Sequence, residues 1–200
     1  MIAARRSRAA NAQHSQASCE HGTPREIVEL ARHALGGIDL DVCTSEYWNR
    51  YSVQAADFYD RRRNGLDPRN PWAGRVFCNP PGADDKAKSR NLVGPFWARM
   101  VTAWRAGQID GAVWIGYSLE QLVKLQGSSW SPLRCLVLVP RDRLEFLQPR
   151  PGLPPVPGGS PTHGNFVALL SSWRFDAIAR AQCARFLERG RELGSIVRPA

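Results

Sequence analysis

The sequence predicts an α/β fold with a mostly parallel sheet, helices on both of its faces and an antiparallel pair of strands at one edge. Apolar runs of strand length, at 75–78, 112–117 and 135–139, alternate with segments of helical periodicity. This alternation is typical of parallel sheets that helices cover. A further strand is expected at 166–170, and it follows 135–139 without a helix between them, which indicates an antiparallel pair.

The chain is long enough for one domain that needs neither disulfides nor a metal to stabilise its core. It has 200 residues, 43% of them hydrophobic, and no apolar run approaches the length of a membrane span. Residues 1–21 are small, polar and basic, so we expect a disordered basic tail followed by a single domain over 22–200. The tail lacks the apolar stretch of a signal peptide, and we expect a cytoplasmic protein without a membrane partner.

The first elements follow from local signals. Thr23-Pro24-Arg25-Glu26 has the form of a capping box with proline at the first helical position, and Gly36-Gly37 follows the last apolar position, so a helix is predicted between them. Residues 38–43 predict a strand. Residues 44–74 are polar and irregular, with aromatic insertions.

The second half continues the alternation. Ser118 is expected to cap a short helix after the strand at 112–117, and a final helix is expected over 176–193. Residues 148–163, rich in Pro and Gly, predict a long loop or a hairpin. Large apolar residues at helical spacing predict a core-facing helix that ends at Gly107: Phe96, Trp97, Met100, Val101 and Trp104.

The segment Asn79-Pro80-Pro81-Gly82 directly follows the strand predicted at 75–78. Proline has a fixed φ and no N–H, and it holds the residue before it in an extended conformation. The strand exit is therefore stiff and places an amide and bare carbonyls at the carboxyl edge of the sheet, where open α/β folds bind ligands. The Asn79 carbonyl and a backbone carbonyl can each accept one N–H of an exocyclic amine, which leaves the nitrogen lone pair aimed at an electrophile. The alternative is a proline-rich turn without function.

The chain is basic, with a formal charge of +9 carried mostly by arginine. Basic residues gather at 5–8, 61–63, 86–90 and along the last segment. Such a surface favours a nucleic acid partner, although it also improves solubility. The cysteines are scattered and form no CxxC pair, so we expect no metal site and no disulfide framework: Cys19, Cys43, Cys78, Cys135 and Cys183.

Taken in order, several segments resemble the small phage-type DNA adenine-N6 methyltransferases, a family of S-adenosylmethionine-dependent amino-methyltransferases with an Asn-Pro-Pro motif. The likeness covers about residues 23–171. The segments that carry it are Thr23-Pro24-Arg25-Glu26-Ile27-Val28, Asp39-Leu40-Asp41-Val42-Cys43, Asn64-Gly65-Leu66, Gly74-Arg75-Val76-Phe77-Cys78-Asn79-Pro80-Pro81, Arg141-Asp142-Arg143-Leu144-Glu145-Phe146 and Pro161-Thr162-His163.

The resemblance implies a Rossmann-like class I methyltransferase fold, S-adenosyl-L-methionine as cofactor and double-stranded DNA as partner. It implies methylation of N6 of adenine, with N4 of cytosine as the alternative, in the cytoplasm of a bacterial host that carries a phage or prophage. A monomer and a homodimer both remain open. The implied catalytic residues are Asn79, Pro80 and Pro81; the cofactor-binding residues Thr23, Pro24, Asp41, Cys43, Glu46 and Asn49; the DNA contacts Gly82, Arg61, Arg62, Arg141 and Arg143.

Two positions depart from the family pattern. Gly82 stands where the family has an aromatic residue that stacks on the extruded base, so a ring would have to come from Phe96, Trp97 or Tyr117. Thr44-Ser45-Glu46 stands where a Gly-x-Gly cofactor loop would follow the first strand.

Each implied residue could also have an ordinary structural role. Asp41 could be a strand-edge carboxylate, Glu46 and Asn49 could face solvent, and the arginines could be solvated. At the level of the whole protein, the alternatives are a non-catalytic DNA-binding protein that keeps the fold and a methyltransferase that acts on RNA or protein.

Overall fold

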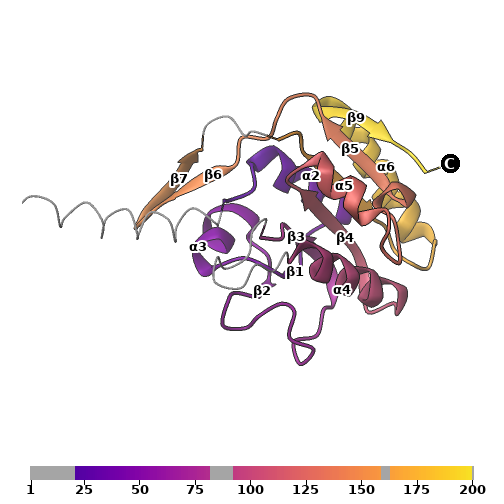
Figure 1. Ribbon diagram of the computed structural model, residues 1–200, viewed down its shortest axis with the longest axis horizontal. Coiled ribbons are helices and arrows are strands. Elements are labelled where there is room, and N and C mark those ends of the chain that lie inside the picture. Colours follow the sequence, from indigo (N-terminus) through magenta and orange to yellow (C-terminus); the bar gives the residue numbers. More distant parts are fainter. Residues whose placement is uncertain (1–20, 82–91, 159–162, 200) are drawn as a thin grey trace, which may run out of the picture.

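The computed structural model describes residues 21–81, 92–158 and 163–199, which form a seven-stranded mixed sheet with helices on both faces and a separate hairpin (Figure 1). Residues 1–20 of the tail expected over 1–21 lie outside the described residues, as do Gly82 and the residues that follow it to 91. None of the described helices combines the length and the hydropathy needed to cross a bilayer.

The sheet has the strand order β2-β1-β3-β4-β8-β5-β9. The first four strands are mutually parallel, β8 is antiparallel to both of its neighbours, and β9 is antiparallel to β5. The strands are β1 (Leu40–Asp41), β2 (Asp57–Phe58), β3 (Gly74–Cys78), β4 (Ile109–Gly116), β5 (Leu136–Pro140), β8 (Phe166–Leu170) and β9 (Gly194–Val197).

The expected α/β class with a mostly parallel sheet is therefore confirmed, and so is the antiparallel pairing of the last two predicted strands. The prediction that this pair lies at the edge of the sheet is wrong. Strand β8 lies between β4 and β5, and the edge is formed by β9, which was not predicted. Its four residues follow a helix directly and pair on one side only, so they carry no strand-length apolar run.

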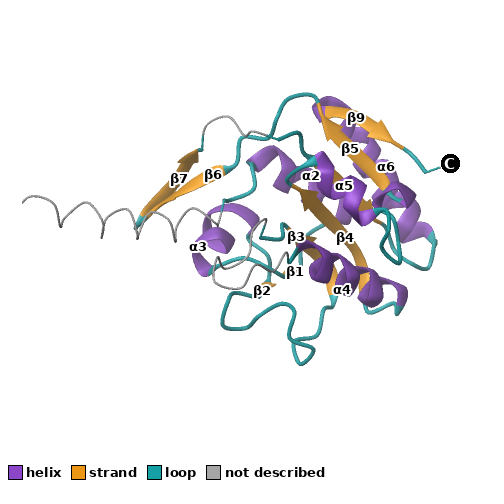
Figure 2. Cartoon of the chain, viewed as in Figure 1, coloured by secondary structure: helices purple, strands orange, loops and turns teal. Residues whose placement is uncertain are grey.

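All but one of the described helices match predicted segments (Figure 2), the exception being the three-residue helix α3. They are α2 (Arg25–Leu35), α3 (Glu46–Trp48), α4 (Val93–Arg105), α5 (Leu119–Leu125) and α6 (Ala177–Leu193), with a π-helical turn at Asn49–Val53 and a 3-10 turn at Pro132–Arg134. Ser118 caps α5 as expected, since its hydroxyl accepts from the backbone N–H of Gln121. Gly36 ends α2 in the left-handed conformation, with φ of 79°.

Three local predictions are corrected. The capping box is wrong: Pro24 takes the N-cap position of α2, and no side chain caps the helix. The strand predicted at 38–43 is reduced to Leu40–Asp41, because only these residues pair on both sides. The segment 44–74 is not wholly irregular, since it contains α3, the π-helical turn and β2; β2 pairs over only two residues and gives no sequence pattern.

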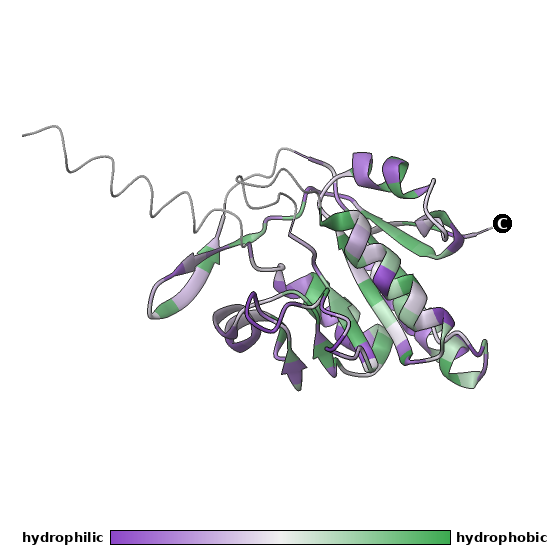
Figure 3. Cartoon of the chain, turned by 60° about the horizontal axis from the view of Figure 1, so that its bottom comes forward, coloured by the Kyte–Doolittle hydropathy of each residue, from purple (hydrophilic) through white to green (hydrophobic). Residues whose placement is uncertain are grey.

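The sheet separates two apolar layers. Helices α2 and α6 pack on one face, where they meet Phe77, Val113 and Leu138. Helices α4 and α5 pack on the other face, where α4 covers Val76 and Cys78. The expected core role of Trp97, Met100 and Trp104 is confirmed, since all three are buried. Figure 3 shows the hydrophobic colouring concentrated along the central strands.

The segment expected to form a loop or hairpin contains strands β6 (Leu147–Arg150) and β7 (Leu153–Pro157), which form a hairpin that projects from the sheet (Figure 1). Its base is tied to the start of the described chain, because Gly22 and Leu147 exchange backbone hydrogen bonds of 3.0 and 2.8 Å. The Tyr47 hydroxyl holds the turn by donating to the Leu153 carbonyl at 2.9 Å.

Candidate functional site

The strand order reverses between β1 and β3. From β1 the chain passes to β2 on one side, and then returns to β3 on the other side of β1. In open α/β sheets, ligands bind outside the carboxyl ends of the strands at such a reversal. Asp41 is the last residue of β1, and Asn79 directly follows β3. The predicted catalytic motif and the predicted cofactor carboxylate therefore meet at the position where this topology favours a ligand site.

Asn79 is held by its side-chain nitrogen. Nδ2 donates to the Thr23 hydroxyl oxygen at 3.1 Å and to the His21 carbonyl at 3.4 Å. A hydroxyl can donate or accept, but a carbonyl only accepts, so the His21 bond decides which end of the amide faces this side. Among the described residues no hydrogen-bond donor reaches Asn79 Oδ1. The strand exit thus presents a carbonyl oxygen of fixed orientation, followed by the buried Pro80 and the half-buried Pro81.

Thr23 links the Asn79 side chain to the segment after β1 through two hydrogen bonds. It is only 2% exposed, its hydroxyl accepts from Asn79, and its backbone carbonyl accepts from the Ser52 hydroxyl at 3.0 Å. The side chain predicted to cap α2 instead positions the amide of the motif. Pro24, next to it, is buried at the start of the helix.

Asp41 carries a buried carboxyl group that has no cation beside it among the described residues. It is 2% exposed and accepts from the Cys43 backbone N–H at 3.2 Å. Burial raises the pKa of Asp41 to about 7, while the hydrogen bonds from Cys43 and the Thr44 side chain oppose that rise. A cation in contact with the carboxyl would lower its pKa again, so this group suits a positively charged ligand.

Asp39, two residues earlier, has a different environment. Its carboxylate pairs with the Arg75 guanidinium through bonds of 2.7 and 2.6 Å and also accepts from the Arg75 backbone N–H at 2.8 Å. The Arg75 contacts hold the pKa of Asp39 below its ordinary value. Asp39 therefore joins β1 to β3, and of the two acids only Asp41 is left for a ligand.

Cys43, which the resemblance implies as a cofactor residue, is half-buried just after β1, and the buried Cys78 lies beside it. Cys43 Sγ lies 3.7 Å from Cys78 Sγ, and burial raises the pKa of both thiols. Neutral thiols are poor nucleophiles. Cys78 is fully buried, which confirms its predicted packing role.

Glu46 and Asn49 lie on the segment after β1. Glu46 is exposed in the first turn of α3. Both ends of the Asn49 amide are used internally, since Oδ1 accepts from the Ala55 N–H at 2.8 Å and Nδ2 donates to the Ala55 carbonyl at 3.1 Å. Asn49 thereby closes the loop that leads to β2, and this use differs from the implied cofactor contact.

The predicted DNA-contacting arginines flank the Asn79 edge. Arg61 and Arg62 are exposed just after β2, and Arg141 and Arg143 are exposed just after β5. Strand β2 is parallel to β1, and β5 has the direction of β4 because both are antiparallel to β8. All four arginines therefore follow carboxyl ends at the same edge of the sheet, on either side of Asn79. Gly82 lies outside the described residues.

Of the three aromatic residues considered as substitutes for the family ring, two are unsuitable. Phe96 is 4% exposed and Trp97 is fully buried in the layer under α4. Tyr117 is half-buried just after β4, which is the strand beside β3. Tyr117 is thus the only one of the three that is not buried.

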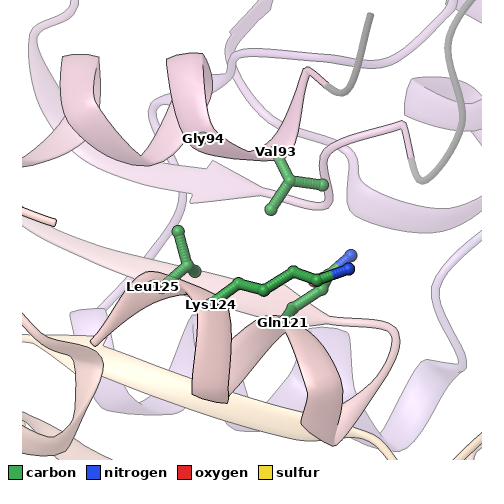
Figure 4. A pocket seen from close by; sticks show the side chains of 5 residues that line it. All are labelled: Val93, Gly94, Gln121, Lys124 and Leu125. Atoms are coloured by element: carbon green, nitrogen blue, oxygen red, sulfur yellow. The ribbon is translucent and has the colours of Figure 1, made fainter. Parts of the chain in front are cut away.

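One feature of this edge was not predicted. A pocket of about 250 Å³ lies between α4 and α5, lined by Val93, Gly94, Gln121, Lys124 and Leu125 (Figure 4). Nothing in the sequence distinguishes Gln121 from the other polar residues of a short amphipathic helix.

Comparison of the chain with protein-family models, with curated proteins and with solved structures found no match. Among the described residues, no group of three His, Cys, Asp or Glu side chains could hold a metal ion.

Proposed function

We propose that the protein is an S-adenosylmethionine-dependent methyltransferase with a Rossmann-like class I fold that methylates an exocyclic amine in DNA, N6 of adenine above all. The observation that carries the proposal is the Asn79 amide. Its nitrogen is bound on the protein side, and its oxygen is left as an acceptor at the carboxyl edge, beside the topological reversal.

The residues at the edge fit the cofactor that the resemblance implies. A sulfonium or ammonium group needs a negative partner, and Asp41 offers a buried carboxyl without a cation. Asp41 would hold the methionine part, with Thr23 and Pro24 bordering it. When bound, S-adenosylmethionine supplies an electrophilic methyl group.

The chain itself positions the amine. Asn79 Oδ1 would accept one N–H, and a proline-flanked backbone carbonyl would accept the other, so the lone pair would be drawn out of conjugation with the ring and left free to attack an electrophile. Prolines on both sides of this carbonyl remove competing N–H donors. Positioning of this kind can lower the activation free energy by about 7–11 kcal/mol in well-oriented reactions. No covalent cysteine is needed.

DNA is the polymer that the charge distribution favours. The arginine pairs after β2 and β5 would contact backbone phosphates on both sides of the site, which gives affinity without sequence choice. Tyr117 would stack on the extruded base in place of the ring that Gly82 lacks. The expected consequence is binding that weakens steeply as salt is raised.

Two observations favour the second candidate, a non-catalytic DNA-binding protein of the same fold. Asp41 is nearly inaccessible, and both ends of the Asn49 amide already bond to Ala55. A protein that had lost the cofactor could keep such a closed edge and still bind DNA through its arginines.

The test is nucleoside mass spectrometry on unmethylated single- and double-stranded DNA incubated with S-adenosylmethionine. Wild type should form N6-methyladenine, Asn79→Ala should form none, and Gln126→Ala, which removes an exposed amide at the end of α5, should equal wild type. Calorimetry should show cofactor binding by wild type and by both variants. If neither a methylated base nor cofactor binding is found, the methyltransferase proposal is refuted and the non-catalytic DNA-binding protein remains. If RNA or protein is methylated and DNA is not, the proposed acceptor is wrong.

A further inference from the structure

An aromatic cluster lies at the amino edge of the sheet, opposite to Asn79. Trp104 is near the end of α4, Trp130 shortly precedes β5, and Trp173 follows β8. Because β8 is antiparallel to β4, the end of β8 lies near the start of β4. The centroid of the Trp104 ring is 5.1 Å from that of Trp130 and 4.6 Å from that of Trp173. The cluster thus joins three separate segments at the edge that the Asn79 site does not use.

Phe175 extends this cluster into solvent. It is 63% exposed, and the centroid of its ring lies 5.6 Å from that of Trp173. Its φ of 51° is in the left-handed region, which a bulky residue rarely adopts and which glycine or asparagine adopts more easily. The chain therefore has an unfavourable backbone conformation at a residue whose ring is not buried in the core. Such an outlier points to a role in binding.

The common structural reason for an apolar residue at this position does not apply to Phe175. It directly precedes Asp176, the N-cap of α6. An apolar residue there often packs against an apolar residue at the fourth position of the helix. That position is Arg180, which is exposed. The capping of α6 therefore leaves the exposed ring of Phe175 unexplained.

Two arginines lie on the ring of Trp130. The guanidinium carbon of Arg105 is 5.2 Å from the ring centroid, and that of Arg134 is 5.3 Å from it. A ring contact of this kind orders a guanidinium group and leaves its N–H donors for an anion. Arg174, which directly precedes Phe175 in the chain, is exposed as well. Among the described residues, none of these three arginines forms an ion pair with a carboxylate.

This surface has an excess of positive charge. The segments 104–110, 130–135 and 173–180 contain four arginines, at 105, 134, 174 and 180, and two acids, Asp110 and Asp176. An oxygen of Asp176 is used within the chain, since it accepts from the backbone N–H groups of Ile178 and Ala179. In the part of the chain that the structure describes, neither acid forms an ion pair with these arginines. The charge therefore favours an anionic partner, and it disfavours a second copy of this basic chain.

Exposed rings beside arginines suit one class of polyanion. A single-stranded nucleic acid offers bases that stack on aromatic side chains and phosphates that contact arginines, whereas a duplex keeps the faces of its bases stacked on one another. We propose that the amino edge of the sheet binds a single strand of nucleic acid, with a base on Phe175 and phosphates at Arg105, Arg134 and Arg174.

This surface is separate from the proposed methylation site. Strand β4 has eight residues, so its length puts roughly 23 Å between the two edges of the sheet. A strand bound at the amino edge is therefore out of reach of Asn79 by direct contact, and its binding does not depend on methyl transfer.

The experiment is a titration of the full chain with an oligothymidylate of about eight nucleotides, followed by fluorescence anisotropy and by NMR. Thymine has no exocyclic amine, so this probe cannot be the methyl acceptor. We expect saturable binding, with shifts of the Phe175 backbone signal and the Trp173 indole N–H signal. Phe175→Leu keeps an apolar side chain without a ring and should bind at least about fivefold more weakly, whereas Phe175→Trp keeps a ring and should bind as wild type does.

Two further variants separate binding from folding and charge from stacking. Phe175→Asn should weaken binding as the leucine does and raise the midpoint of urea unfolding, because asparagine adopts the left-handed conformation more easily. The double variant Arg105→Gln, Arg134→Gln should reduce the slope of log affinity against log salt by about 0.7 for each phosphate contact that is lost. The matched control, Arg191→Gln, removes an exposed arginine at the other end of α6 and should leave the slope unchanged.

Several results would overturn the proposal. These are equal affinity of wild type and Phe175→Leu, equal affinity for an abasic strand of the same length, and shifts confined to the residues after β2 and β5. Equally tight binding of a polyglutamate peptide would show an acidic protein partner and would also overturn it. Binding at Phe175 by a wild type that transfers no methyl group would refute the proposed enzyme activity and still support this surface. Methyl transfer without any shift at Phe175 would refute this surface alone.

Discussion

The substitution Asp41→Asn gives a prediction whose size follows from the structure. Asparagine has nearly the same shape and stays neutral at every pH. Burial raises the pKa of Asp41 from its ordinary 3.8 to about 7 in the folded protein. Each unit of difference between the two pKa values corresponds to about 1.4 kcal/mol of unfolding free energy. The difference between 3.8 and about 7 therefore amounts to about 4 kcal/mol.

Because the pKa of Asp41 is raised by folding, its contribution to stability falls as the pH rises. Below pH 3.8 the carboxyl is neutral in both the folded and the unfolded state, and its contribution to stability is fully present. As the pH rises toward 7, the unfolded chain ionises first, and the contribution is lost. Wild type should therefore lose up to about 4 kcal/mol relative to Asp41→Asn between pH 4 and pH 8. The thiols of Cys43 and Cys78, whose pKa values burial raises above 9, do not titrate in this range.

The assay is urea unfolding of both proteins at one-unit pH steps from 4 to 9, followed by circular dichroism. The difference in unfolding free energy should change in favour of the variant as the pH rises, and most of the change should fall between pH 4 and pH 7. A difference that stays constant over the whole range would show that Asp41 is not buried as a lone carboxyl. S-adenosylmethionine, as a cation, should also bind wild type more tightly as the pH rises through 7, with no such trend in the variant.

Three further outcomes are expected. Thr23→Val removes the hydroxyl that holds Asn79, so it should lower the methyl-transfer rate about tenfold and the free energy of unfolding by about 1 kcal/mol. Thr23→Ser keeps the hydroxyl and should keep the wild-type rate and stability. Equal rates for the two variants in a methylation time course would contradict this prediction. Gln182→Leu leaves the buried Ser172 N–H unpaired and removes the bond to the carbonyl of the exposed Asp110, so it should cost about 1–3 kcal/mol in urea unfolding. A loss below about 0.5 kcal/mol would show that water replaces the amide. Asp39→Ala breaks the pair with Arg75, whose two side chains are 34% and 38% exposed, and should cost about 1 kcal/mol at pH 7. Because Arg75 lowers the pKa of Asp39, that stabilisation is lost as the pH falls below 3.8, and a cost that persists at pH 2 in acid-unfolding curves would rule out the ion pair.

The sequence predicts best where one local signal decides the structure. The apolar run that ends in Asn-Pro-Pro becomes β3, with the motif at the carboxyl edge, because a buried strand and two prolines leave few alternatives. The helix over 93–105 follows from its aromatic periodicity in the same way. Both predictions depend on residues close together in the chain.

The rest depends on contacts between distant residues. Thr23 has the sequence pattern of a helix cap, yet its hydroxyl is used by Asn79, 56 positions away. Strand β8 pairs with β4 on one side and β5 on the other, and the residues of a strand do not by themselves determine which strands it pairs with. Asn49 and Gln121 are both polar residues on short helical segments. Only the folded chain shows that Ala55 pairs the first and that the second lines a pocket.

The central claim is that Asn79 acts through an acceptor oxygen held toward the substrate amine. The most direct test compares single-turnover methyl transfer to DNA by wild type, Asn79→Asp and Asn79→Leu, which have side chains of similar size. The aspartate keeps an acceptor oxygen and should retain reduced transfer, whereas the leucine has none and should be slower than wild type by at least about a hundredfold. Transfer by the leucine variant at the wild-type rate would contradict the account.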